Sequence, residues 1–210
     1  MTFLEFQKSF SQLPVIPVME IEKTFPGFDR NALTRWQKKG YIQKIRSGFY
    51  RLTTQPLSGE RDLFFAANRI YAPSYVSLHS ALGWYGFIPE GVFMTTSVST
   101  RKTQEFKTPI GYFSYRSIQR ELFFGYRLIS INGFPIKIAD PAKTILDFLY
   151  LNPQYDSADD FDGLRLNFWE LQEELDLKLF ENYLRLFASK SLEARAKKFL
   201  KFLKDNAVTV

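Results

Sequence analysis

The first 55 residues alternate short amphipathic stretches with chain breaks. Phenylalanines at positions 3, 6 and 10 recur at helical spacing, which predicts a helix over residues 3–10. A second short helix is expected over residues 18–24, before Pro26 and Gly27. These two stretches predict a small helical unit at the start of the chain.

A third helix is predicted from Arg30 to Lys39, with Asp29 as its N-cap and Gly40 as the residue that ends it. Leu33 and Trp36 lie three residues apart and are expected to point inward. The opposite stripe of this helix is polar, and it consists of Asn31, Thr34, Arg35 and Lys38.

A two-stranded ribbon is predicted next, with strands over residues 41–45 and 49–52 and a turn at Arg46-Ser47-Gly48. Three helices followed by a ribbon are the element order of a winged helix-turn-helix. We therefore expect a domain of this kind over residues 1–55, followed by a polar linker over residues 53–59.

Residues 61–210 mix both kinds of element and are expected to form a second, mixed α/β domain with a helical C-terminal end. Its predicted helices cover residues 61–71, a segment capped by Ser77 and ending near Gly86, 141–151 behind an Asp140-Pro141 start, and most of the chain after an acidic loop. Its predicted strands cover residues 92–98, 112–116, 126–131 and 134–138, with a hairpin turn at Asn132-Gly133. The expected fold class is therefore α+β.

Composition excludes several classes of function. The chain has 210 residues with 45% hydrophobic and 17% aromatic content, which is enough for a real core. It has no cysteine and one histidine, so disulfide scaffolds, thiolate metal sites and two-histidine centres are excluded. No apolar run is long enough to span a bilayer, and no signal peptide is seen. We expect a cytoplasmic protein without membrane association, catalytic residues, cofactor or metal.

The net charge of +6 is concentrated in one short segment. Residues 26–51 hold seven basic residues and one acid, Asp29, whereas the rest of the chain balances. A local basic surface indicates an anionic partner, and a helix with outward donors fits the major groove of double-stranded DNA. The expected DNA-binding residues are Arg30, Asn31, Thr34, Arg35, Lys38, Lys39, Lys44, Arg46, Ser47 and Arg51. A solvated charged face and a protein-binding module remain as alternatives.

Two other interpretations compete. Glu105-Phe106-Lys107, with Asp62 or Glu90 as a distant partner, fits a metal-dependent nuclease, although such acid-x-base triplets arise by chance. A pure protein-interaction module would use the acidic block 140–181 and the basic block 185–205. His79, near Ser77 but without a nucleophile motif, is expected to be structural.

Several short segments in order resemble one known family. They are Ser74-Tyr75-Val76-Ser77-Leu78-His79-Ser80-Ala81-Leu82, Tyr85-Gly86-Phe87-Ile88-Pro89-Glu90, the segments 96–103, 113–115 and 124–126, Ala139-Asp140-Pro141-Ala142-Lys143-Thr144-Ile145-Leu146-Asp147, and residues 38–50. Together they resemble AbiEi-type antitoxins of type IV toxin–antitoxin (abortive infection) systems, over about residues 26–150. The chain departs from the family pattern at Ala142 and Thr144.

The resemblance implies a regulator with two activities. The family's N-terminal winged helix represses its own operon by binding inverted repeats, and its C-terminal domain counters a nucleotidyltransferase toxin without being an enzyme. The expected partners are therefore the protein's own promoter DNA and a cognate nucleotidyltransferase toxin. A homodimer on DNA is expected from symmetry only.

Overall fold

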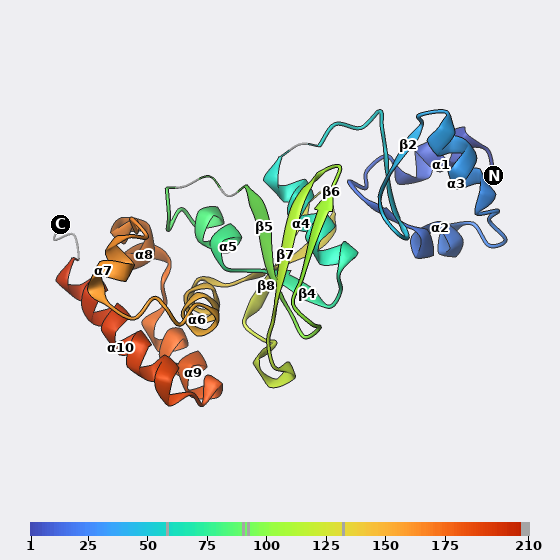
Figure 1. Ribbon diagram of the computed structural model, residues 1–210. Helices are drawn as coiled ribbons and strands as arrows, with labels where there is room; N and C mark the ends of the chain where they lie inside the picture. Colours follow the sequence, from blue (N-terminus) through green and yellow to red (C-terminus); the bar gives the residue numbers. More distant parts are fainter. Residues whose placement is uncertain (58, 90, 92, 132, 207–210) are drawn as a thin grey trace.

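The computed structural model describes residues 1–57, 59–89, 91, 93–131 and 133–206. The chain forms a mixed α+β protein, as predicted, and its parts follow one another along the sequence. A helical N-terminal part carries a three-stranded sheet, a six-stranded sheet lies in the middle, and helices form the C-terminal part (Figure 1).

The N-terminal part has three helices and three strands among the described residues. They are α1 (Phe3–Phe10), β1 (Ile16–Pro17), α2 (Val18–Thr24), α3 (Asn31–Lys38), β2 (Ile42–Arg46) and β3 (Phe49–Leu52). The predicted bounds of the first two helices are confirmed. The third helix begins later than predicted, because the Asp29 carboxylate accepts from the Asn31 amide while Arg30 occupies the N-cap position without a side-chain cap.

Gly40 ends α3 as predicted. Its φ of +71° lies in the left-handed region that suits glycine. The Gly40 amide donates to the Gln37 carbonyl at 2.9 Å, and the Tyr41 amide donates to the Trp36 carbonyl at 2.9 Å. This closure turns the chain directly from α3 into β2.

Strand β1 was not predicted, because two residues carry no readable pattern. It pairs antiparallel with β3, giving the order β1-β3-β2 and leaving β2 at one edge. The three helices and this sheet enclose a small apolar core. Its buried members are Phe6, Phe10, Ile16, Ile21, Ala32, Leu33, Trp36, Ile42, Tyr50 and Leu52.

The central sheet has the strand order β6-β7-β5-β4-β9-β8. Its strands are β4 (Ser74–Val76), β5 (Met94–Ser99), β6 (Gln104–Thr108), β7 (Gly111–Ser117), β8 (Tyr126–Ile131) and β9 (Phe134–Ala139). The pairs β4–β9 and β5–β7 are parallel, and the others are antiparallel. The strands predicted near β5, β7, β8 and β9 are confirmed, whereas β4 and β6 were missed. The predicted hairpin turn includes Asn132, which lies outside the described residues.

Helices cover both faces of this sheet. On one face lies α4 (Glu60–Ile70), whose Ala67 carbonyl accepts hydrogen bonds from the hydroxyls of Ser74 and Tyr115. On the other face lie α5 (His79–Trp84) and α6 (Pro141–Leu151). The prediction that Ser77 caps α5 is wrong, because its hydroxyl donates instead to the buried Asp147 carboxylate of α6.

The C-terminal part is helical, as predicted. It comprises α7 (Ala158–Asp162), α8 (Phe168–Glu174), α9 (Leu177–Phe187) and α10 (Lys190–Asp205), and a short 3₁₀ turn, η1 (Arg120–Leu122), lies earlier in the chain. Asp140 caps α6 as predicted, accepting from the Lys143 amide at 2.8 Å. Arg195 of α10, which belongs to the basic block 185–205, is buried, and its Nε donates to the Leu149 carbonyl.

The two sheets are joined by shared packing. Val15 and Ile45 of the N-terminal part are buried in the larger core of the central sheet rather than in their own. The β2–β3 ribbon therefore has one face on the N-terminal core and the other on the central part. Across the described residues, no helix has both the length and the apolar character needed to cross a bilayer.

Candidate nucleic-acid interface

Helix α3 presents its polar stripe to solvent. Leu33 and Trp36 are buried, at 3% and 7% exposure, so the helix is anchored by the face that the sequence predicted. The opposite residues, Asn31, Thr34, Arg35 and Lys38, are all exposed. Burial of the apolar face and the Gly40 closure therefore fix which donors and acceptors face outward.

A hollow of about 550 Å³ lies between the N-terminal half of α3 and the β2–β3 ribbon. It brings together five of the predicted residues, namely Arg30, Asn31, Thr34, Lys44 and Ser47. The start of α2 forms the third wall, including Met19, which is 80% exposed. We call this surface the α3–ribbon groove.

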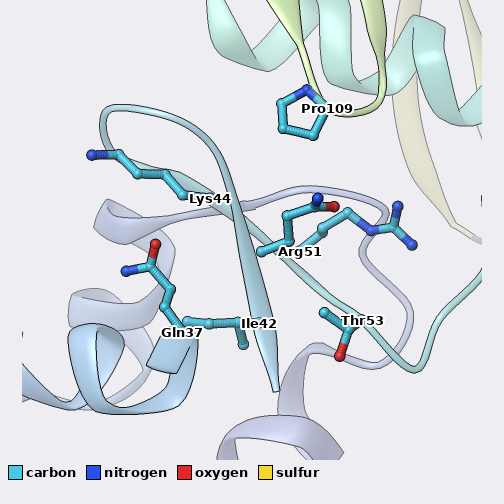
Figure 2. A pocket seen from close by; sticks show the side chains of 7 residues that line it. Gln37, Ile42, Lys44, Arg51, Thr53 and Pro109 are labelled. Atoms are coloured by element: carbon cyan, nitrogen blue, oxygen red, sulfur yellow. The ribbon is translucent and has the colours of Figure 1, made fainter. Parts of the chain in front are cut away.

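Lys44 also borders a second hollow of about 550 Å³, on the other side of edge strand β2 (Figure 2). Here Gln37 at the end of α3, Gln43 and Arg51 on the ribbon, and Pro109 of the β6–β7 turn line the space. Figure 2 shows Lys44 and Arg51 pointing in opposite directions from the ribbon. Lys44 lines both hollows, whereas the Arg51 side chain is directed toward the linker, where it donates to the Gln55 carbonyl.

Acidic neighbours hold two of the predicted arginines. Arg30 Nε donates to Glu22 Oε1 of α2, and Arg35 Nη2 donates to Asp29 Oδ2 at 3.1 Å. The hydrogen bond from Arg30 lowers the pKa of Glu22. The pKa of Asp29 is lowered chiefly by the Asn31 amide and also by Arg35. All four side chains are at least 37% exposed, so these ion pairs are weak and can exchange for phosphates.

Arg46, one of the predicted DNA-binding residues, is held by other parts of the protein. Its Nη1 donates to the Ile70 carbonyl at the end of α4, and its guanidinium lies 4.0 Å from the Phe106 ring centroid. Strand β6 and helix α4 therefore hold this side chain. A long side chain next to a turn can fold back onto a neighbouring part, and nothing in the local sequence reveals that neighbour.

Arg51 is likewise held within the protein. Its Nε donates to the Leu52 carbonyl and its Nη2 to the Gln55 carbonyl, so it fastens the linker to the ribbon. The predicted phosphate contact by Arg51 would require these bonds to break.

Among the predicted residues, the lysines are the charged side chains that remain available to a ligand. Lys38, Lys39 and Lys44 are exposed and have no ion-pair partner in the part of the chain that the structure describes. Lys39 lies 5.9 Å from the Tyr41 ring centroid, beyond the end of α3. The ten predicted residues therefore fall into three groups: groove residues, residues on the flank of α3 (Arg35, Lys38, Lys39), and two arginines held by backbone carbonyls. Of these two, Arg46 contacts the central part and Arg51 contacts the linker.

Sequence reasoning missed the α2 wall of the groove. Met19 lines it because β1 pairs with β3 and places the start of α2 beside the ribbon, and Glu22 of the same helix pairs with Arg30. Glu22 is four residues ahead of Pro26, and no spacing rule links it to Arg30. Only the tertiary pairing shows the contact.

The residues of the nuclease hypothesis are dispersed or engaged. Glu105 and Lys107 are exposed on edge strand β6, and Lys107 lies 5.4 Å from the Tyr112 ring centroid. Asp62 is buried on α4, and Glu90 lies outside the described residues. No group of three or more histidine and acidic side chains suited to a metal occurs among the residues that the structure describes.

His79, which was expected to be structural, packs against α6. It is half-buried with its ring edge against Phe148, and burial lowers its pKa.

Comparison of the chain with models of protein families finds no match, and comparison with curated proteins finds none either.

Proposed function

We propose that residues 1–55 form a winged helix-turn-helix that binds double-stranded DNA, and that the protein is a transcriptional autorepressor. The proposal is supported by the element order α1-β1-α2-α3-β2-β3 and the strand order β1-β3-β2. The observation that carries it is the α3–ribbon groove, where Arg30, Asn31, Thr34, Lys44 and Ser47 line one concave surface.

In the α3–ribbon groove, the residues of α3 contact the DNA bases and the residues of the ribbon contact the phosphates. Helix α3 enters the major groove, where Asn31 suits adenine and Thr34 can contact either donors or acceptors on base edges. Lys44 and Ser47 on the ribbon contact phosphates and set the register without reading sequence. Arg30 and Arg35 exchange their carboxylate partners for bases or phosphates when DNA is bound.

The antitoxin activity is proposed from the resemblance alone. If a nucleotidyltransferase is encoded beside this chain, the test is co-expression of the two proteins. Growth rescue by the full chain supports the activity, whereas continued growth arrest at confirmed expression contradicts it. A variant with Asn31→Ala and Thr34→Ala should still rescue, because DNA reading and toxin neutralisation use different parts of the chain.

DNA binding is tested by titrating labelled duplexes from the protein's own upstream region and a scrambled duplex. Asn31→Ala should cost about 1–3 kcal/mol on the specific duplex and little on the scrambled one. Lys44→Ala should weaken both alike and flatten the salt slope by about 0.9, because one phosphate contact is lost.

Lys8→Ala is the matched control, because Lys8 is an exposed lysine on α1 outside the groove. Its affinity and salt slope should equal those of the wild type. Equal affinity of the wild type for every duplex would rule out the repressor.

The acids beside the groove give a prediction of opposite sign. Glu22→Gln and Asp29→Asn each remove a negative charge that competes with phosphate for Arg30 or Arg35. Each should raise DNA affinity by roughly threefold to tenfold at low salt, with less gain at high salt. In the Asp29→Asn variant the new amide oxygen can still accept from the backbone at the start of α3, so thermal unfolding should change little. A fall in affinity in both variants would show that these arginines need their acids in order to read DNA.

A further inference from the structure

An apolar groove of about 390 Å³ crosses the helical C-terminal part, which lies far from the N-terminal part in Figure 1. Leu171 and Leu175 form its buried floor, and Leu200 and Leu203 of α10 form one side. Leu177 at the start of α9 is 55% exposed on the other side. A concave leucine-lined surface of this kind favours an apolar partner.

The two walls of this groove carry opposite charges. Glu181 on α9 and Lys204 on α10 both line it, and both are exposed. Neither has an ion-pair partner in the described part of the chain, and they do not pair with each other across the groove. Each charge is therefore available to a group on an incoming molecule.

The same polarity extends beyond these two residues. Residues 168–181 of α8 and α9 carry five acids and one lysine, whereas residues 197–204 of α10 carry four lysines and no acid. Of these lysines, Lys198 is engaged by Asp156 at 2.9 Å, and Lys197, Lys201 and Lys204 are exposed. Of the five acids, Glu174 is engaged by Arg127 at 3.9 Å, and Glu181 lines the groove. Glu181 and Lys204 thus give the two sides of the groove opposite charges above an apolar floor.

We propose that this groove is the interface of a homodimer. A two-fold axis lying parallel to the groove places the positive wall of each copy against the negative wall of the other. Lys204 of each copy then faces Glu181 of the second copy, and Leu177 of each copy packs against the half-buried Leu200 and Leu203 of the other. An axis across the groove would set like charges against each other, so charge alone selects the orientation.

A second copy fits better than an unrelated partner because the charges on the two sides of the groove are complementary to those of a copy related by this two-fold axis. A uniformly acidic or basic partner would meet repulsion at one wall of the groove. Isologous contact also lets a small groove nucleate a larger interface, since each residue is used twice. Flanking residues of α8 and α10 then add area toward the roughly 1,200–2,000 Å² that is typical of stable pairs. The inference concerns a surface remote from the DNA groove and does not depend on DNA binding.

Charge exchange tests the proposal in the full-length chain. The wild type should sediment as a dimer at micromolar concentrations. Lys204→Glu and Glu181→Lys should each weaken dimerisation roughly tenfold or more, because each substitution creates two like-charge contacts per dimer. A mixture of the two variants should recover a heterodimer, because the glutamate introduced in one chain then meets the lysine introduced in the other. Leu177→Lys should also give a monomer, and no mixture with the charge variants should rescue it.

Leu128→Lys is the control, because Leu128 is an exposed leucine on β8 outside the groove. Thermal unfolding of every variant checks folding. A monomeric wild type, or a dimer that survives both charge variants, would overturn the proposal, and so would variants that fail to pair when mixed. If the Lys204→Glu variant is a monomer and still binds a DNA half-site, the dimer interface and the DNA-binding function are shown to be independent.

Discussion

At the scale of single residues, Gly125 is the described glycine at which an added Cβ would meet the closest neighbours. Its φ is +68°, and an added Cβ would lie 2.9 Å from Tyr183 Cε2 and 3.0 Å from Lys143 Cβ. Gly125→Ala should lower the free energy of unfolding by about 3 kcal/mol, through left-handed strain and overpacking together. Gly133→Ala, also at positive φ but with open space, should cost only about 1 kcal/mol. If the two variants lose the same free energy of unfolding in urea denaturation, the Cβ at position 125 does not collide with Tyr183 and Lys143.

His79 is the residue whose charge depends on pH near neutrality. Burial lowers its folded-state pKa below the ordinary 6.5. As pH falls through 6.5, the unfolded chain takes up a proton that the folded chain refuses, so the free energy of unfolding should decrease. His79→Gln should flatten this slope in urea titrations, and because it removes the chain's one histidine no other imidazole replaces it. If the free energy of unfolding of the variant depends on pH as in the wild type, groups other than His79 cause the pH dependence.

Residue-level prediction from the sequence succeeded where a local rule applied. The inward Leu33 and Trp36, the glycine that ends α3 and the Asp140 cap all follow from spacing and capping chemistry. No local rule predicts the contacts of Arg46, Arg51 and Arg195, whose side chains donate to backbone carbonyls of the folded chain. Composition shows where charge lies along the chain but not which part of the protein a long side chain will reach.

At the scale of elements, a buried polar cluster joins α6 to strand β4. The Lys143 ammonium donates to Asp147 one turn along α6 and to the Tyr75 hydroxyl at 2.9 Å. Tyr75 and Ser77 donate to the other carboxylate oxygen at 2.8 and 2.9 Å, and both charged side chains have 0% exposure. Burial, followed by the nearby carboxylate, raises the Tyr75 pKa well above its usual value.

Replacing one charged member of this cluster should lower the free energy of unfolding more than replacing both. Lys143→Met should lower the free energy of unfolding by about 3–5 kcal/mol, because a buried carboxylate loses its counter-charge. Lys143→Met combined with Asp147→Leu should lose less than the single variant, because no uncompensated charge remains. Purely additive losses in denaturant unfolding would show that the two groups act independently.

Elements with long patterns were predictable, and short ones were not. Helices α1, α2 and α6 and strand β8 have the predicted bounds, because their apolar period or their capping residues are local. Strands β1 and β4 have two and three residues and exist because longer neighbours offer them an edge. Ser77 resembled a helix cap, but a buried carboxylate competed for its hydroxyl more strongly than the backbone did.

At the scale of the whole molecule, the contact between the two parts is the feature that the sequence did not predict. Ile45 of the ribbon is buried in the larger core, and Arg46 lies between the Phe106 ring and the carboxyl end of α4. A cation at the end of a helix is favoured by its dipole and its free carbonyls. The position of the α3–ribbon groove is thereby fixed relative to the central sheet.

Arg46→Ala should therefore uncouple the two parts. It removes the stacking on Phe106 and the hydrogen bond to Ile70, with an expected cost of about 1–2 kcal/mol. The wild type should unfold in one calorimetric transition and the variant in two, with faster protease cleavage of the linker after Thr53. Arg46→Lys should behave like the alanine variant, because a lysine lacks the planar group that stacks and donates together. The variant should still bind DNA through α3, since Arg46 does not line the groove. Binding of DNA to the N-terminal part should then no longer stabilise the central part against unfolding. One unchanged transition in both variants would place the contact between the parts in Val15 and Ile45 rather than in Arg46.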